Sequence, residues 1–111
     1  MGIGGTRTKF IEIVIYANGA SGAAKTIDWS NGAIQKVSMT DECTFTFDNP
    51  IVGVCRLFIN NSDPLGPYRS YWPGSVVWKD SAPPAFAIDQ TVLAEFYYDG
   101  SNYYGQWNEY F

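Results

Sequence analysis

The clearest pattern along the chain is an alternation of apolar and polar residues in segments 42–47 and 54–60. A period of two is typical of strands with one buried face. Asp48-Asn49-Pro50 separates the two segments, and Pro50 ends the first strand because it has no N–H for a ladder. The second segment is then a return strand. The alternate positions predicted to face the core are Cys43, Phe45, Phe47, Cys55, Leu57 and Ile59.

Turn residues divide the rest of the chain into similar short elements. The sequence of 18–24 (NGASGAA) predicts a loop, and Asn31-Gly32 predicts a type I′ hairpin turn, since both residues tolerate a positive φ. Segment 61–84 holds five of the six prolines and predicts an irregular connection. The further predicted strands are 25–30, 33–40 (with Val37 and Met39 inward), 69–72, 75–79, 88–98 and 103–107, the last two joined as a hairpin through 99–102.

The run TKFIEIVIY at 8–16 differs from these strands because both of its faces are largely apolar. A strand covered on both sides, by the core and by a neighbouring subunit, explains such a pattern. The candidate residues for an oligomer or capsid interface are Arg7, Lys9, Phe10, Ile11, Ile13 and Ile15.

Together these elements predict an all-β fold, an antiparallel β-sandwich or jelly-roll of about eight short strands with almost no helix. Nowhere do apolar residues recur at helical spacing for three turns. The expected organisation is a flexible Gly-rich arm at 1–7 followed by one sandwich domain at 8–111.

Composition narrows the range of partners. The net charge is −4 without a cluster of basic residues, which argues against nucleic acid, and no apolar run is long enough to span a membrane. Aromatic residues make up 17% of the chain, more than a small core requires. Some of these rings are therefore expected at an interface, where Tyr and Trp are favoured.

The sequence also argues against an enzyme. It contains no histidine, which removes the usual general base and the usual zinc ligand, and we expect no metal and no cofactor. Most carboxylates lie in predicted turns; Glu12 and Glu95 are the only strand-centred pair that a glycosidase could use, and nothing in their spacing singles them out. Cys43 and Cys55 leave a cross-strand disulfide open, although two buried free thiols are the simpler interpretation.

Two groups of aromatic residues remain. Tyr68, Tyr71, Trp72 and Trp78 fit a platform on which sugar rings stack, but a plug at the end of the sandwich or at a subunit seam is the favoured interpretation. In the second group, cross-strand pairing within the predicted hairpin is a sufficient role. That group is Phe96, Tyr97, Tyr98, Tyr103, Tyr104 and Trp107.

Three segments in order resemble a β-rich module common in tailed-bacteriophage virion proteins. They are TIDWSNGAIQKVSMTDECTFTFDNP (26–50), YWPGSVVWKDSAPP (71–84) and FYYDGSNYYGQ (96–106). The module has the form "ID–G––Q–V–LT–––TFTF––P", then "WP––V–W––––AP", then "FYYDG–NYYG". The resemblance covers about residues 25–107.

The resemblance implies a β-sandwich that assembles in symmetric oligomers, commonly trimers, without catalysis. Only residues 1–24 precede the module, whereas long fibre proteins carry a shaft there. We therefore expect a capsid decoration (cement) protein, assembled in the bacterial host cytoplasm and located on the capsid surface of the virion. Its partners would be itself, as a homotrimer, and the major capsid protein. The alternative is a tail-fibre or head-fibre tip that binds host-surface glycan through Tyr68, Tyr71, Trp72 and Trp78.

Overall fold

The computed structural model describes residues 14–85 and 90–110. Within them the chain forms nine strands and two single-turn 3-10 helices, η2 (Trp29–Asn31) and η3 (Lys79–Ser81), so the predicted all-β class is confirmed. None of the helices in this part of the chain could cross a membrane. The strands are β1 (Tyr16–Ala20), β2 (Ala24–Asp28), β3 (Ile34–Ser38), β4 (Cys43–Asp48), β5 (Gly53–Asn61), β6 (Ser70–Tyr71), β7 (Val76–Trp78), β8 (Gln90–Tyr98) and β9 (Tyr103–Tyr110).

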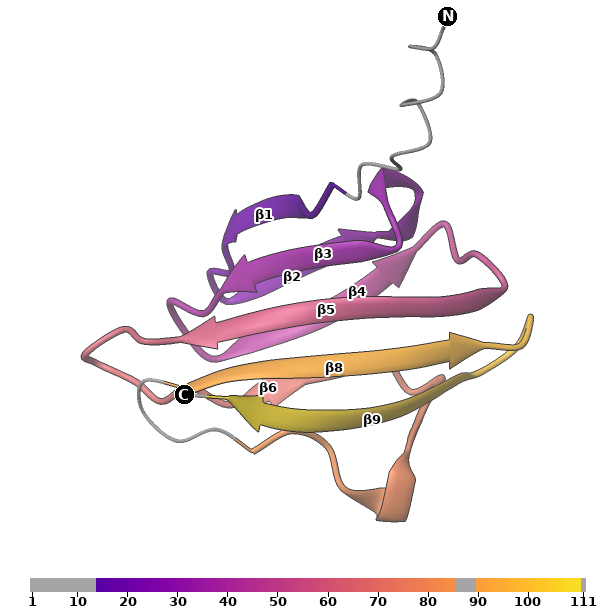
Figure 1. The fold of residues 1–111 in the computed structure, drawn as a ribbon. Coiled ribbons are helices and arrows are strands. Elements are labelled where there is room, and N and C mark those ends of the chain that lie inside the picture. The colour runs from indigo at the N-terminus through magenta and orange to yellow at the C-terminus, as the bar shows by residue number, and fades with distance from the viewer. Residues whose placement is uncertain (1–13, 86–89, 111) are drawn as a thin grey trace, which may run out of the picture.

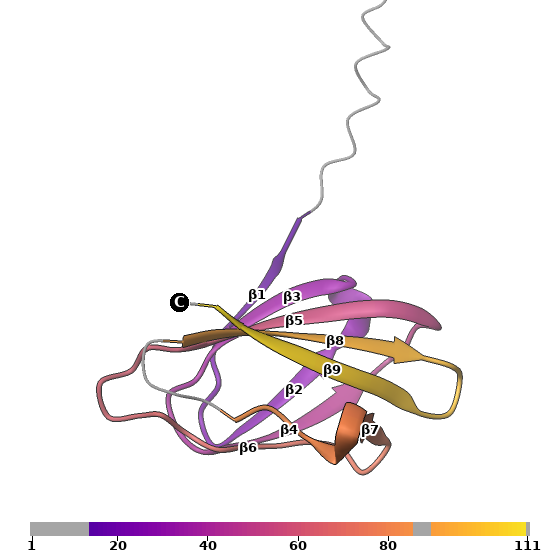
Figure 2. The same ribbon diagram turned by 60° about the horizontal axis from the view of Figure 1, so that its bottom comes forward.

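The strands form two layers (Figures 1 and 2). One layer is a six-stranded sheet in the order β1-β3-β5-β8-β9-β7, and the other is a three-stranded sheet in the order β2-β4-β6. From β1 to β7 the chain changes sheet after every strand. Consecutive strands therefore face one another across the core instead of pairing side by side.

This winding makes most of the strand pairs parallel, contrary to the antiparallel sandwich predicted. When the chain returns to a sheet after crossing the core and back, the new strand runs in the same direction as the one beside it. Accordingly β1–β3, β3–β5, β2–β4 and β4–β6 are parallel. The pair β7–β9 is also parallel, although only β8 of the same sheet separates its two strands, and β5–β8 and β8–β9 are antiparallel. The predicted return strand, 54–60, is present as β5, but it lies in the other sheet from β4.

The predicted C-terminal hairpin is confirmed. Strands β8 and β9 pair over their whole length, from Thr91↔Tyr110 to Tyr98↔Tyr103. The Asp99 carboxylate closes the turn by accepting hydrogen bonds of 2.8 Å from the backbone N–H groups of Ser101 and Asn102. These backbone bonds, with that of Asn102 first, lower the pKa of Asp99.

Near the N-terminus the predicted boundaries were wrong. The strand expected at 8–16 is described only from Val14, and the observed β1 begins at Tyr16 and continues into the predicted loop at 18–24. Gly19 has a φ of 72° and sits where the β1–β3 register shifts, so the glycine permits an irregular strand instead of ending it. The expected arm at 1–7 and the start of that strand lie outside the described residues.

The Asn31-Gly32 hairpin was also wrong. Strands β2 and β3 lie in different sheets, and η2 connects them. The Asp28 carboxylate caps this helix by accepting a 2.9 Å hydrogen bond from the Ser30 backbone N–H. The buried Gln35 side chain then fixes the turn from inside, with its Nε2 donating to the carbonyl oxygens of Asp28 (2.7 Å) and Gly32 (2.9 Å). A capped helical turn that redirects the chain to the other layer replaces the expected tight turn.

The core lies between the two sheets, and the inward positions predicted from alternation are confirmed. Val37, Met39, Cys43, Phe45, Cys55, Leu57 and Ile59 are all buried, and Phe47 packs against them. Part of the core consists of aromatic rings in contact with one another, here called the aromatic cluster. Its members are Trp29, Phe45, Phe47, Trp72, Trp78, Phe96 and Tyr103.

All three segments that carry the family resemblance contribute rings to the aromatic cluster. Segment 26–50 supplies three of the rings, 71–84 supplies Trp72 and Trp78, and 96–106 supplies Phe96 and Tyr103. The aromatic cluster thus brings together residues that lie far apart in the sequence.

Candidate binding surfaces

Trp72 and Trp78, two of the four candidate sugar-stacking residues, belong to the aromatic cluster. The Trp72 ring stacks on Phe45 with the centroids 4.8 Å apart and an interplanar angle of 19°. It meets Trp78 edge-to-face at 5.3 Å, and its Nε1 donates to Ser70 Oγ at 2.9 Å. Both Trp rings are partly buried and pack on the core. Both rings thus take part in core packing instead of forming an exposed platform.

The other two members of the group lie elsewhere. Tyr71, the last residue of β6, is 46% exposed. Tyr68 packs against the core, and Asn61 holds its backbone through hydrogen bonds to both the N–H and the carbonyl oxygen. Partial burial, followed by the charge of Asp63, raises the pKa of Tyr68. The structure therefore does not unite the four residues in one exposed surface.

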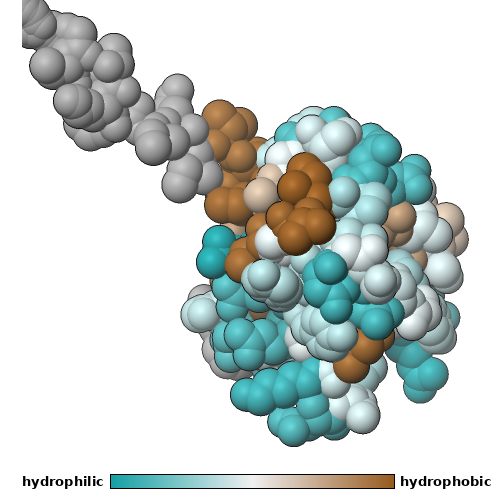
Figure 3. Space-filling view, turned by 90° about the vertical axis from the view of Figure 1, so that its right-hand side faces the viewer, coloured by the Kyte–Doolittle hydropathy of each residue, from teal (hydrophilic) through white to brown (hydrophobic). Residues whose placement is uncertain are grey.

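Exposed hydrophobic side chains lead into the edge strand β1. Val14, Ile15 and Tyr16, here called the N-terminal edge, are 73%, 42% and 41% exposed. Figure 3 shows hydrophobic residues at the surface where the described chain begins. Of the predicted interface residues only Ile15 is described; Arg7, Lys9, Phe10, Ile11 and Ile13 lie outside the described part of the chain.

Beside Ile15 a depression of about 450 Å³ continues over the outer face of the six-stranded sheet. Ala17 of β1, Lys36 of β3 and Phe58 of β5 line it. The N-terminal edge is thus continuous with a hollow on the outer face of its own sheet, which gives a contacting chain a shaped surface.

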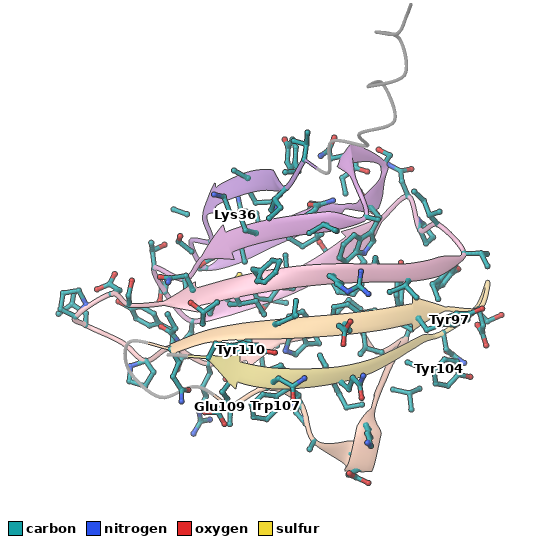
Figure 4. All side chains as sticks on the ribbon, viewed as in Figure 1. Lys36, Tyr97, Tyr104, Trp107, Glu109 and Tyr110 are labelled. Atoms are coloured by element: carbon teal, nitrogen blue, oxygen red, sulfur yellow. The ribbon has the colours of Figure 1, made fainter. Side chains whose placement is uncertain are left out.

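A second depression, of about 460 Å³, lies on the same outer face over β5, β8, β9 and β7, and the sequence did not single it out. The register aligns two rows of side chains across it. The first row is Val54, Tyr97, Tyr104 and Val77; the second is Arg56, Glu95 and Gln106, with Lys79 following β7 beside them. We call this surface the two-row face, and Figure 4 shows Tyr97 and Tyr104 side by side at its end of β8 and β9.

The described carboxylates and thiols do not form a catalytic or metal-binding group. Glu95 forms an ion pair with Arg56, and its Oε2 lies 2.7 Å from Nε, while Glu12 lies outside the described residues. Within the described ranges no three His, Cys, Asp or Glu residues lie close enough together to hold a metal ion.

The two cysteines are both buried free thiols, on β4 and β5 in opposite sheets. Of the two interpretations of the cysteines, a cross-strand disulfide or two buried free thiols, the structure has the free thiols. Burial raises the pKa of Cys55 to about 12 and is also the main cause of the raised pKa of Cys43. Such thiols are poor nucleophiles at neutral pH because the reactive form is the thiolate.

Comparison with known protein families, curated proteins and solved structures found no match.

Proposed function

We propose that this chain is a structural subunit of a tailed-phage virion, a capsid decoration protein that assembles as a homotrimer and contacts the major capsid protein. Two observations support the proposal. The three segments that resemble the virion module all build the aromatic cluster, so the resemblance corresponds to one physical core. In addition, the N-terminal edge exposes hydrophobic side chains that a partner would cover.

The N-terminal edge carries the assembly part of the proposal. Three consecutive hydrophobic residues are exposed there, and fully burying one large apolar side chain contributes roughly 1.5–3 kcal/mol. Within the described residues β1 pairs only with β3, so its other side presents unpaired backbone groups to which a further strand could add. A neighbouring copy could bury the apolar side chains and pair these backbone groups at the same time.

An enzymatic role finds no comparable support. Glu95 is engaged by Arg56, and both thiols are buried with raised pKa values. Glycan recognition by the fibre-tip alternative also loses support, since Trp72 and Trp78 pack in the aromatic cluster instead of lying side by side on the surface.

The oligomeric state tests the assembly part directly. Analytical ultracentrifugation of the full chain should show a trimer, and Ile15→Glu should dissociate it, because a carboxylate would be buried in the contact. Leu65→Glu is the matched control: Leu65 is 84% exposed in the connection after β5, away from the N-terminal edge. A wild-type chain that stays monomeric at all concentrations would contradict the assembly part.

The proposed place of the chain in a virion is tested on the assembled particle. Quantitative mass spectrometry of purified virions should give this chain a copy number comparable to that of the major capsid protein. A copy number matching the few tail fibres would refute the decoration role in favour of a fibre tip, and absence from the particle would refute both.

A further inference from the structure

The two-row face has the features of a binding site, and we propose that it binds a short saccharide. In this arrangement sugar rings lie on Tyr97 and Tyr104, and their hydroxyl groups bond to Arg56, Glu95 and Gln106. The inference does not depend on the proposed virion role, and of the four residues that the sequence suggested for sugar stacking, only Trp78 lines this surface.

The first row supplies an aromatic platform. Tyr97 and Tyr104 are direct partners in the β8–β9 register and are 52% and 47% exposed. Val54 pairs with Tyr97 on one side, and Val77 pairs with Tyr104 on the other. The C–H-rich face of a pyranose can lie on such rings, as aromatic rings pack on other apolar surfaces.

The second row supplies hydrogen-bonding groups next to this platform. It lies two residues further along each strand, roughly 7 Å away at the usual strand rise. The Arg56–Glu95 ion pair uses Nε of the guanidinium and Oε2 of the carboxylate. Both Nη groups of Arg56 and Oε1 of Glu95 thus remain for a ligand, so donors and an acceptor lie side by side.

This pairing of groups matches the chemistry of a sugar. Each hydroxyl is both a donor and an acceptor, and neighbouring hydroxyls can bond to a guanidinium and a carboxylate at once. Gln106 adds an amide with both functions, and Lys79 adds a further donor at the end of the row. A purely apolar partner surface would leave these groups without bonds, at a cost in affinity.

The shape of the surface also favours a small ligand. The depression has a volume of about 460 Å³, within the range of roughly 300–1,000 Å³ common for small-molecule sites. Most of its side chains stand on β5, β8 and β9, the antiparallel part of the sheet, whose strands pair along their full lengths. Little ordering is needed on binding, because paired strands fix the spacing of the two rows.

The test is an NMR titration of the full chain with maltotriose, cellotriose and triacetylchitotriose, each raised to several millimolar. At least one of them should shift the amide signals of Tyr97, Tyr104 and Arg56. Tyr97→Leu should weaken that binding by about tenfold, since it keeps an apolar side chain but removes the ring, whereas Tyr97→Phe should retain it. Tyr71→Leu is the matched control: this tyrosine is similarly exposed but belongs to the other sheet.

The outcomes that overturn the proposal are distinct from those that overturn the virion role. The saccharide site is refuted if none of the three sugars shifts these signals, or if Tyr97→Leu binds as well as the wild type. It is also refuted if Tyr97→Leu lowers the oligomer mass, since the two-row face would then be a subunit contact. The amide spectrum of each variant, recorded without sugar, verifies that the fold is retained.

Discussion

Replacing Gly105 with alanine adds one methyl group where β9 lies against Trp78 and Phe96 of the aromatic cluster. A Cβ at this position would lie 2.9 Å from Cε3 and Cζ3 of Trp78 and 3.2 Å from Cδ1 of Phe96. Both rings also pack against other rings of the aromatic cluster, so a shift away from the new methyl group would disturb these contacts. Overpacking of this kind costs about 1–3 kcal/mol.

Another effect of the substitution acts in the opposite direction. Alanine restricts the unfolded chain more than glycine does, which stabilises the folded state by about 0.4–1 kcal/mol where the backbone is compatible. The clash outweighs this gain. We therefore expect Gly105→Ala to lower the free energy of unfolding by ~1–2 kcal/mol, and to lower Tm by about 4–10 °C in a domain of this size.

Urea unfolding followed by fluorescence measures the difference, and Gly74→Ala is the matched control. A Cβ at Gly74 would meet no atom within 4 Å, so that variant should be unchanged or slightly stabilised. The reasoning is refuted if Gly105→Ala is no less stable than Gly74→Ala. Trp78→Phe removes the ring atoms nearest to the new methyl group, so the cost of Gly105→Ala should fall in that background, as a double-mutant cycle would show.

Three further predictions concern buried groups. Cys43 and Cys55 should react with a thiol reagent far more slowly in the native chain than in urea, and equal rates in a colorimetric assay would contradict their burial. Burial raises the pKa of both Cys55 and Tyr103 to about 12, from usual values of about 9 and 10. The unfolded chain loses these protons at a lower pH than the folded chain, so the stability that the two groups contribute is complete below pH 9 and declines towards pH 12, by up to about 1.4 kcal/mol per pH unit for each group. Tyr103→Phe should therefore reduce the fall of the urea midpoint with pH. An unchanged slope would show that Tyr103 does not cause the decline. Gln35→Leu leaves the carbonyl oxygens of Asp28 and Gly32 without their bonds and should lower the free energy of unfolding by ~1–3 kcal/mol in calorimetry, whereas a neutral result would show that water replaces the amide.

The inward positions could be predicted from the sequence because a strand with one buried face alternates apolar and polar residues along the chain. The alternation at 42–47 and 54–60 placed Cys43, Phe45, Cys55 and Leu57 in the core, and the structure confirms each of them. The strand pairing could not be predicted in the same way. Nothing near Phe45 or Leu57 indicates that β4 and β5 belong to different sheets, since alternation shows which face is buried but not which strand lies beside it.

The two-row face could likewise be predicted only in part, because strand pairing brings its residues together. Burial of Phe96 and Tyr103 implies that the next residues, Tyr97 and Tyr104, point outward. Half of the first row could therefore be predicted from the sequence. Val54 and Val77 were not, because they join the row only through the β5–β8 and β7–β9 pairings. In contrast, the sequence singled out Trp72 and Trp78 as candidates for an exposed platform, yet the structure packs both rings against the core, in the aromatic cluster.

The alternation of the chain between the two layers also bears on how the protein reaches its native state. Among the described strands, only β8 and β9 are neighbours both in sequence and in a sheet. In every other pair, at least one strand lies between the two partners along the chain. Long loops must therefore close before most contacts form, a feature of domains that fold in milliseconds to seconds. The β8–β9 hairpin can form first by itself, and β5 can then add to it. We expect substitutions in this hairpin to slow refolding, and those in β1 mainly to speed unfolding.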